Sequence, residues 1–180
     1  GDIALHIAEG QSFTVGLVDR PDLSGLIGKT RIAADDTTRG VATSGWRGRS
    51  FSLGIADAVT VLARTAAQAD AAATVIANAI DLPHHPAIVR CPAHDIQTDN
   101  DLGARLVTRD VGPLPFSDIN MALDVGAACA RRLVTAGLID GAALRLQGET
   151  RIVALTDIDQ KSSPSPQGAV RSKTESLMYA

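Results

Sequence analysis

The chain has 180 residues, of which 45% are hydrophobic and 21% are charged, and this composition excludes disorder along its whole length. Lys and Arg total 17 against 20 Asp and Glu, and aromatic residues make up 3%, so we expect no nucleic-acid partner. No run of about 18 apolar residues occurs, and we therefore expect no membrane span. The two cysteines cannot form a disulfide framework, which favours a cytoplasmic location.

The first part of the chain is typical of β-structure followed by a helix. The predicted strands are residues 2–8, 12–18, 29–34 and 58–63. We expect the first two to form a hairpin around Glu9 and Gly10. Thr65 and Gln68 have the spacing of a capping box, which predicts a helix over 66–80.

The second part combines strands with a second long helix. Short strands are predicted at 87–91 and 105–111, and a hairpin is predicted from 142–146 and 151–155 around the turn 147–149. Ser117 or Asp118 is expected to cap a helix over 119–136 that stops at Gly137. These elements predict an α+β fold of antiparallel sheets with two long helices over 1–158, followed by a flexible linker-like arm at 159–180.

Asp70 and Thr74 form the first candidate site. They are four residues apart near the start of the predicted helix, so they share one helix face. A carboxylate and a hydroxyl so placed can bind Mg²⁺ together with phosphate oxygens. The spacing alone favours a structural role, in which Asp70 interacts with the helix dipole and Thr74 bonds to the helix backbone.

Four short motifs carry a family resemblance. Gly1-Asp2-Ile3, Ala42-Thr-Ser-Gly-Trp46, residues 59–63 and Ala69-Asp70 to Thr74 follow the order and approximate spacing of GGDI, ATSG, SVTVVA and ADALAT. This pattern resembles ApbE-like proteins, the FAD:protein FMN transferases, over most of residues 1–155. Residues 42–60 look closer still to the UPF0280 family, an ApbE-like branch.

The resemblance implies a site as well as a fold. It implies that Asp70 and Thr74 hold a Mg²⁺ ion on the FAD pyrophosphate, that Asp70 is also catalytic, and that FMN passes to a Thr or Ser of a partner protein. Gly1, Asp2, Ser44 and Gly45 would then line the cleft. The chain departs from the transferases between residues 46 and 58, where it has no histidine in place of their HIIDP motif.

The segment after Ser44 supplies other candidates. Arg47 and Arg49, beside Trp46, could bind the carboxylate or phosphate of a small anionic ligand, or could be solvated surface charges. Asp57 could be a general base or a residue at the entry to a strand. Ser44 is a candidate catalytic residue, although Ala42 stands where a nucleophile elbow needs glycine.

A zinc site is not expected. His84, His85, Cys91 and His94 lie close together in the sequence, but no second pair of ligands with metal-binding spacing accompanies them.

Gly1 lies within a motif that is internal in ApbE-like chains. We therefore expect that the N-terminal portion of the family fold is missing here, by truncation or by processing, and that a companion N-terminal fragment or a second copy of the chain completes the protein.

Three functions remain open. The first is an ApbE-like enzyme of the UPF0280 type, acting on a small anionic or nucleotide-like ligand by metal-assisted flavin or phosphoryl transfer. The second is a processed two-chain hydrolase of a small amide that uses Ser44, Arg47 and the new terminus. The third is a flavin-binding or assembly protein without catalysis.

Overall fold

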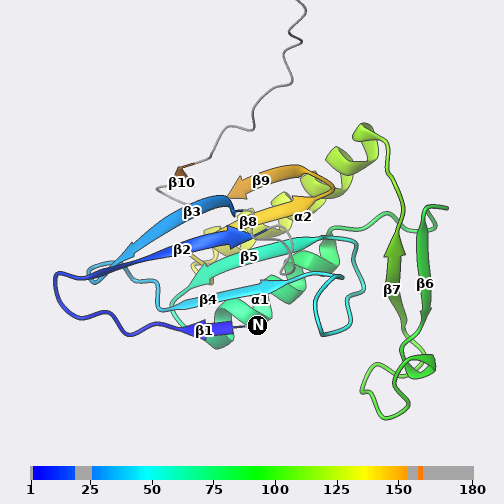
Figure 1. Cartoon of the computed structure of the whole chain (residues 1–180), viewed down its shortest axis with the longest axis horizontal. Coiled ribbons are helices and arrows are strands. Elements are labelled where there is room, and N and C mark those ends of the chain that lie inside the picture. Colours follow the sequence, from blue (N-terminus) through cyan, green and yellow to red (C-terminus); the bar gives the residue numbers. More distant parts are fainter. Residues whose placement is uncertain (1, 19–25, 154–157, 160–180) are drawn as a thin grey trace, which may run out of the picture.

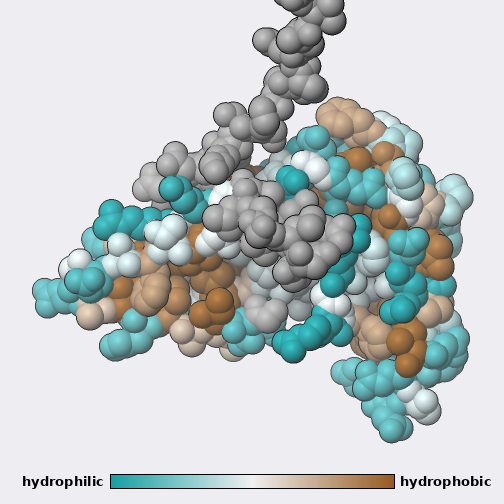
Figure 2. Space-filling view, viewed as in Figure 1, coloured by the Kyte–Doolittle hydropathy of each residue, from teal (hydrophilic) through white to brown (hydrophobic). Residues whose placement is uncertain are grey.

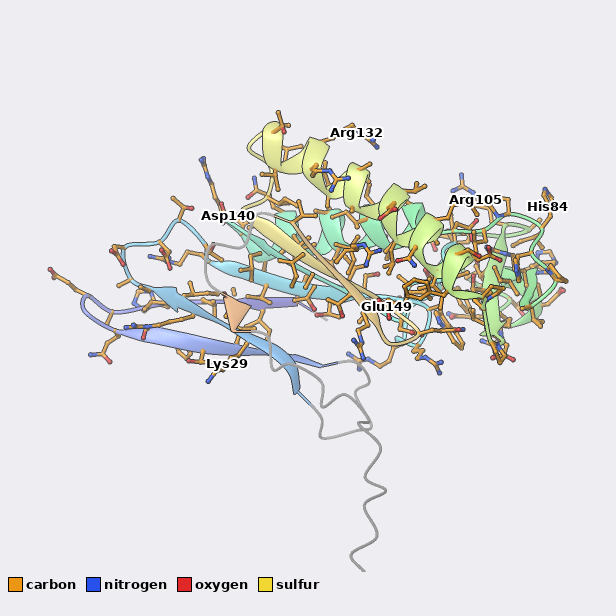
Figure 3. All side chains as sticks on the ribbon, turned by 90° about the horizontal axis from the view of Figure 1, so that it is seen from above. Lys29, His84, Arg105, Arg132, Asp140 and Glu149 are labelled. Atoms are coloured by element: carbon orange, nitrogen blue, oxygen red, sulfur yellow. The ribbon has the colours of Figure 1, made fainter. Side chains whose placement is uncertain are left out.

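The structure, a computed structural model, describes residues 2–18, 26–153 and 158–159. It has three layers: two helices, a five-stranded antiparallel sheet, and a smaller β layer (Figure 1). Figure 3 shows the helices with Arg132 on one side of the large sheet and the β layer with Lys29 on the other. The α+β prediction is confirmed, whereas Gly1 and residues 160–180 of the predicted arm lie outside the described residues.

The large sheet brings together strands from both ends of the chain. Its order is β1 (Asp2–Ala4), β4 (Gly40–Ser44), β5 (Ala58–Ala63), β8 (Gly141–Leu146) and β9 (Glu149–Val153). The strand predicted at 58–63 is confirmed as β5, and all six of its residues are buried. Gln147 and Gly148 have φ values of 42° and 93° in the β8–β9 turn, so the predicted hairpin is confirmed.

The predicted hairpin between residues 2–8 and 12–18 is wrong. β1 pairs with β4, whereas β2 (Ser12–Val18) pairs with β3 (Leu26–Ala33) in the smaller sheet. The predicted strand at 29–34 overlaps β3, which begins three residues earlier and ends at Ala33, and β10 (Ile158–Asp159) pairs with the other edge of β3. The smaller sheet packs through Ile32 against Val41 and Leu62 of the large sheet, and this apolar contact gives β2 and β3 their own layer.

The first helix agrees closely with its prediction. α1 spans Ala66–Ala79, and the Thr65 hydroxyl accepts a hydrogen bond from the Gln68 backbone N–H at 3.2 Å. Its buried face packs against β4 and β5 and is made mostly of alanine. These small side chains let the helix lie close to the sheet, which accounts for a core with few aromatic residues.

The second helix begins earlier than its sequence indicates. α2 spans Phe116–Thr135, with Pro115 at the N-cap and no capping side chain. Ser117 and Asp118 therefore lie in the first helical turn, because the backbone N–H of Asp118 already bonds to the Pro115 carbonyl. The predicted stop is confirmed, since Gly137 follows the helix with a φ of 68°.

A two-stranded hairpin projects from the body of the molecule (Figure 1). It consists of β6 (Ile88–Pro92) and β7 (Leu106–Val111), joined by residues that include the short 3₁₀ helix Ala93–Asp95. Figure 2 shows hydrophobic side chains on the side where it projects, and Val89 and Leu106 are exposed there. Among the described residues, no helix is long and apolar enough to cross a membrane.

Candidate functional site

Most of the predicted site residues meet at one end of the large sheet. The antiparallel register places Ser44 opposite Val59, and Ala58 opposite Arg145. The end of β4, the start of β5 and the β8–β9 turn therefore lie at the same end. Asp2 is opposite Ala42, so β1 brings its carboxylate to the neighbouring edge of that end.

The segment between β4 and β5 is held close to the sheet. The backbone N–H of Trp46 donates to the Ala56 carbonyl at 3.0 Å, so the outgoing and returning chains remain side by side. A Cβ atom on Gly45 would lie 2.5 Å from the Asp57 carbonyl oxygen, and only glycine permits this approach. Figure 2 shows a hydrophilic surface over this segment.

Asp57 ties three parts of this site together. Its Oδ1 accepts hydrogen bonds from the Trp46 indole Nε1 at 3.1 Å and from the Arg47 Nε at 2.8 Å. Its Oδ2 accepts one from the backbone N–H of Gln147 at 2.6 Å. The carboxylate is 6% exposed and both oxygens have N–H donors, which offsets the cost of burying its charge.

The two arginines of the segment are not equivalent. The Arg47 guanidinium is paired with Asp57, lies 4.3 Å from the centre of the Trp46 ring, and belongs to a side chain that is 34% exposed. Arg49 is exposed and makes no hydrogen bond or ion pair within the described ranges. The predicted pair of guanidinium groups is thus one fixed group and one solvated group.

Asp70 and Thr74 lie together on the exposed face of α1, as their spacing indicates. Ala69, Ala73 and Ile76 form the opposite, buried face. In the part of the chain that the structure describes, the Asp70 carboxylate has neither a hydrogen bond nor an ion pair. Its oxygens are therefore available to a ligand.

The sheet register relates Asp2 and Ser44 to α1. The side chain of Ala42 belongs to the core that α1 covers. Its antiparallel partner Asp2 projects from the same face, and so does Ser44 two residues further along β4. Asp2 and Ser44 thus lie on the helix side of the sheet, at the edge where α1 also packs against β1.

Two of the three histidines in the 84–94 region lie beside an aspartate. His85 Nε2 lies 3.2 Å from Asp118 Oδ2, and His94 Nε2 lies 3.1 Å from Asp95 Oδ1. Cys91 is partly buried on β6. Among the described residues, no three His, Cys, Asp or Glu side chains form a group that could hold a metal ion.

Gln147 is a site residue that the sequence did not indicate. Besides its backbone bond to Asp57, its side chain accepts from the Leu114 N–H at 2.9 Å and donates to the Gly112 carbonyl at 2.7 Å. It therefore connects Asp57 to the chain that enters α2. The turn at 147–149 marks its position in the sequence, but no local pattern indicates contacts across such separations.

Two comparisons relate this architecture to known proteins. A protein-family profile described as "AbpE bacteria" matches residues 1–152. A "UPF0280 protein" of Methanothermobacter thermautotrophicus is 46% identical over 85 residues. That alignment covers 46% of this chain and 32% of the relative, so the matched region spans about a third of the curated protein.

Proposed function

Because the chain belongs to the family described as "AbpE bacteria", we propose that it is an ApbE-like enzyme of the UPF0280 type that acts on a phosphate-bearing, nucleotide-like ligand. In this proposal the ligand extends from Asp70 and Thr74 in the first half of α1 towards Ser44 and the 45–57 segment, which packs against the C-terminal end of that helix. The reaction is metal-assisted flavin or phosphoryl transfer, with FAD as the first ligand to test. A cytoplasmic location is part of the same proposal.

The observation that carries this proposal is the state of the Asp70 carboxylate. It is exposed, it has no partner within the described residues, and Thr74 presents a hydroxyl one helical turn away. Mg²⁺ prefers oxygen ligands and is commonly held by one or two carboxylates together with substrate phosphates. Two protein oxygens on one helix face fit such a shared site, in which the ligand supplies the remaining oxygens.

The other residues of the site assist binding in this proposal. Asp70 and Thr74 would hold the Mg²⁺ ion, which would supply positive charge to the phosphate oxygens during transfer. In this proposal Ser44 and Asp2 contact the ligand from the sheet, and Arg47 contacts an anionic group of the ligand. Both oxygens of Asp57 already accept hydrogen bonds, so we assign it no proton transfer.

The amide-hydrolase alternative finds less support in this geometry. Such a reaction needs a general base within hydrogen-bond reach of the attacking group. Both oxygens of Asp57 already accept hydrogen bonds from N–H donors, and its side chain is buried. Gly1, whose amine was the other candidate, lies outside the described residues.

Thermal unfolding with FAD, in the presence and absence of Mg²⁺, tests the proposal. We expect FAD to raise the melting temperature only with Mg²⁺, because a ligand bound by the native state alone stabilises it. Asp70→Asn and Thr74→Val should remove the increase, whereas Asp110→Asn, at an exposed position on β7, should retain it. An increase that persists in Asp70→Asn would contradict the metal assignment.

Product analysis distinguishes catalysis from binding alone. If the wild-type protein transfers FMN, AMP should accumulate from FAD in the presence of Mg²⁺ and a hydroxyl-bearing acceptor, and Asp70→Asn should abolish this release. Metal-dependent FAD binding without AMP release under any acceptor condition would instead favour the flavin-binding alternative.

A further inference from the structure

The Arg47 side chain is oriented before any ligand arrives. Its Nε donates to Asp57, and its guanidinium lies against the Trp46 ring. Neither of its terminal Nη groups makes a hydrogen bond to another described residue. The N–H groups on the two terminal Nη atoms therefore remain available to a ligand. Two parallel N–H groups of a guanidinium match two oxygens of a phosphate.

The group that orients Arg47 is itself fixed. Asp57 Oδ2 accepts from the Gln147 backbone N–H, and Oδ1 also accepts from the Trp46 indole. The backbone N–H of Asp57 donates to the Arg145 carbonyl on β8 at 3.0 Å. Asp57 is therefore held to β8 through its backbone and to the turn between β8 and β9 through its carboxylate, independently of Arg47.

This arrangement lowers the entropy cost of binding. A free arginine side chain loses rotamer entropy when a ligand immobilises it. Arg47 has already lost much of that freedom in the folded protein, whereas Arg49 has not, since it is exposed and unpaired within the described part of the chain. Although the two arginines carry the same charge, Arg47 should therefore contribute more than Arg49 to the binding of an anionic ligand.

We propose that Arg47 forms a single-arginine subsite for one phosphate group of the ligand, and that Asp57 is its positioning residue. The identity of the ligand as a phosphate compound rests on the proposed function, but the subsite does not require Mg²⁺, Asp70 or Thr74. Arg49 contributes no direct contact. Asp57 acts through Arg47 and does not touch the ligand.

The chain offers a built-in probe of this subsite. Trp46 is its single tryptophan, and the Arg47 guanidinium stacks on it. Tryptophan fluorescence therefore reports on this location alone. Inorganic pyrophosphate, titrated without Mg²⁺, should change the emission in a saturable way, and titration calorimetry gives the same Kd independently of the fluorophore.

Three variants decide the assignment. Arg47→Gln should weaken pyrophosphate binding about tenfold or more, because it removes a charge-assisted pair of hydrogen bonds. Asp57→Asn should weaken binding by a similar factor in the folded protein. The asparagine NH₂ group would face an N–H donor where the carboxylate oxygen accepted a hydrogen bond, so Arg47 would lose its fixed orientation. Arg49→Gln, the matched control, should bind as the wild type does.

The outcomes separate this proposal from the preceding one. Wild-type affinity in Arg47→Gln, or a loss in Arg49→Gln equal to that in Arg47→Gln, overturns the subsite. If Asp57→Asn does not fold, Arg47→Lys replaces it. Lysine keeps the positive charge but cannot donate from an Nε to Asp57 and present two outer N–H groups at once, so unchanged affinity in this variant, measured by calorimetry, overturns the positioning role. Asp70→Asn should retain metal-free pyrophosphate binding, so failure of the metal site leaves this test intact.

Discussion

Asp57 and Asp70 lie on the same domain, yet they have opposite environments. Asp57 is buried and accepts three hydrogen bonds, from an indole, a guanidinium and a backbone amide. Asp70 is exposed on α1 without a partner in the described ranges. A carboxylate surrounded by donors holds structure together, whereas one without donors is available to a ligand. Asp57 therefore belongs to the architecture of the site, and Asp70 is the carboxylate to which the proposed function gives a chemical role.

The largest expected effect comes from removing the buried carboxylate. Asp57→Ala leaves two or three N–H donors without an acceptor, and it should lower the free energy of unfolding by about 2–3 kcal/mol. The partial exposure of Arg47 keeps the loss below that of a fully buried ion pair. Urea unfolding followed by circular dichroism measures it, with Asp70→Ala as control. Equal stability of the two variants would break the comparison.

Gly45→Ala tests the close packing of the segment beside Asp57. The added methyl group would lie 2.5 Å from the Asp57 carbonyl oxygen, so the two chains must separate at a cost of about 1–3 kcal/mol. Gly112→Ala is a suitable control, because its nearest neighbour would be 3.4 Å away. The same urea experiment applies, and similar midpoints for the two variants would show that the segment is loosely held.

Gln147→Ala tests the connection from Asp57 to the start of α2. The variant loses the side-chain bonds to Gly112 and Leu114 but keeps the backbone N–H to Asp57, and we expect a cost of about 1–2 kcal/mol. Gln97→Ala, in an exposed loop, should have no measurable effect. A Trp46 emission maximum that shifts in Gln147→Ala alone would indicate that the connection extends to the indole.

Asp70→Asn has the smallest expected effect on stability. The side chain is exposed and has no described partner, so unfolding free energy should change by less than about 0.5 kcal/mol. The same variant should nevertheless lose the Mg²⁺-dependent increase in melting temperature with FAD. A destabilisation comparable to that of Asp57→Ala would mean that Asp70 has a structural role after all.

The sequence predicted correctly those features that depend on residues close together in the chain. The strand at 58–63, the Thr65 cap of α1 and the stop of α2 at Gly137 depend on residues a few positions apart, and all three are confirmed. The hairpin at 2–18 failed because Asp2–Ala4 finds its partner in β4, across a long stretch of intervening chain. The early start of α2 depends on Pro115, which suits a helix entry as well as Ser117 does.

The candidate site shows the same division. The spacing of Asp70 and Thr74 was enough to place them on one helix face, and the proximity of Arg47 to Asp57 follows from a turn of about ten residues. The third donor to Asp57 comes from Gln147, 90 positions later, and only the pairing of β5 with β8 brings it there. The positioning role that we propose for Asp57 therefore depends on long-range strand order, which local sequence patterns do not reveal.

The burial of β5 in the centre of the sheet has a consequence for hydrogen exchange. This strand lies between β4 and β8, with α1 on one face and the Ile32 cluster on the other, and all its residues are buried. Its amide protons should exchange with solvent only when the whole domain unfolds. A ligand that slows exchange in the 45–57 segment alone closes the site locally. A ligand that also slows β5 stabilises the entire fold, and one exchange experiment can distinguish the two.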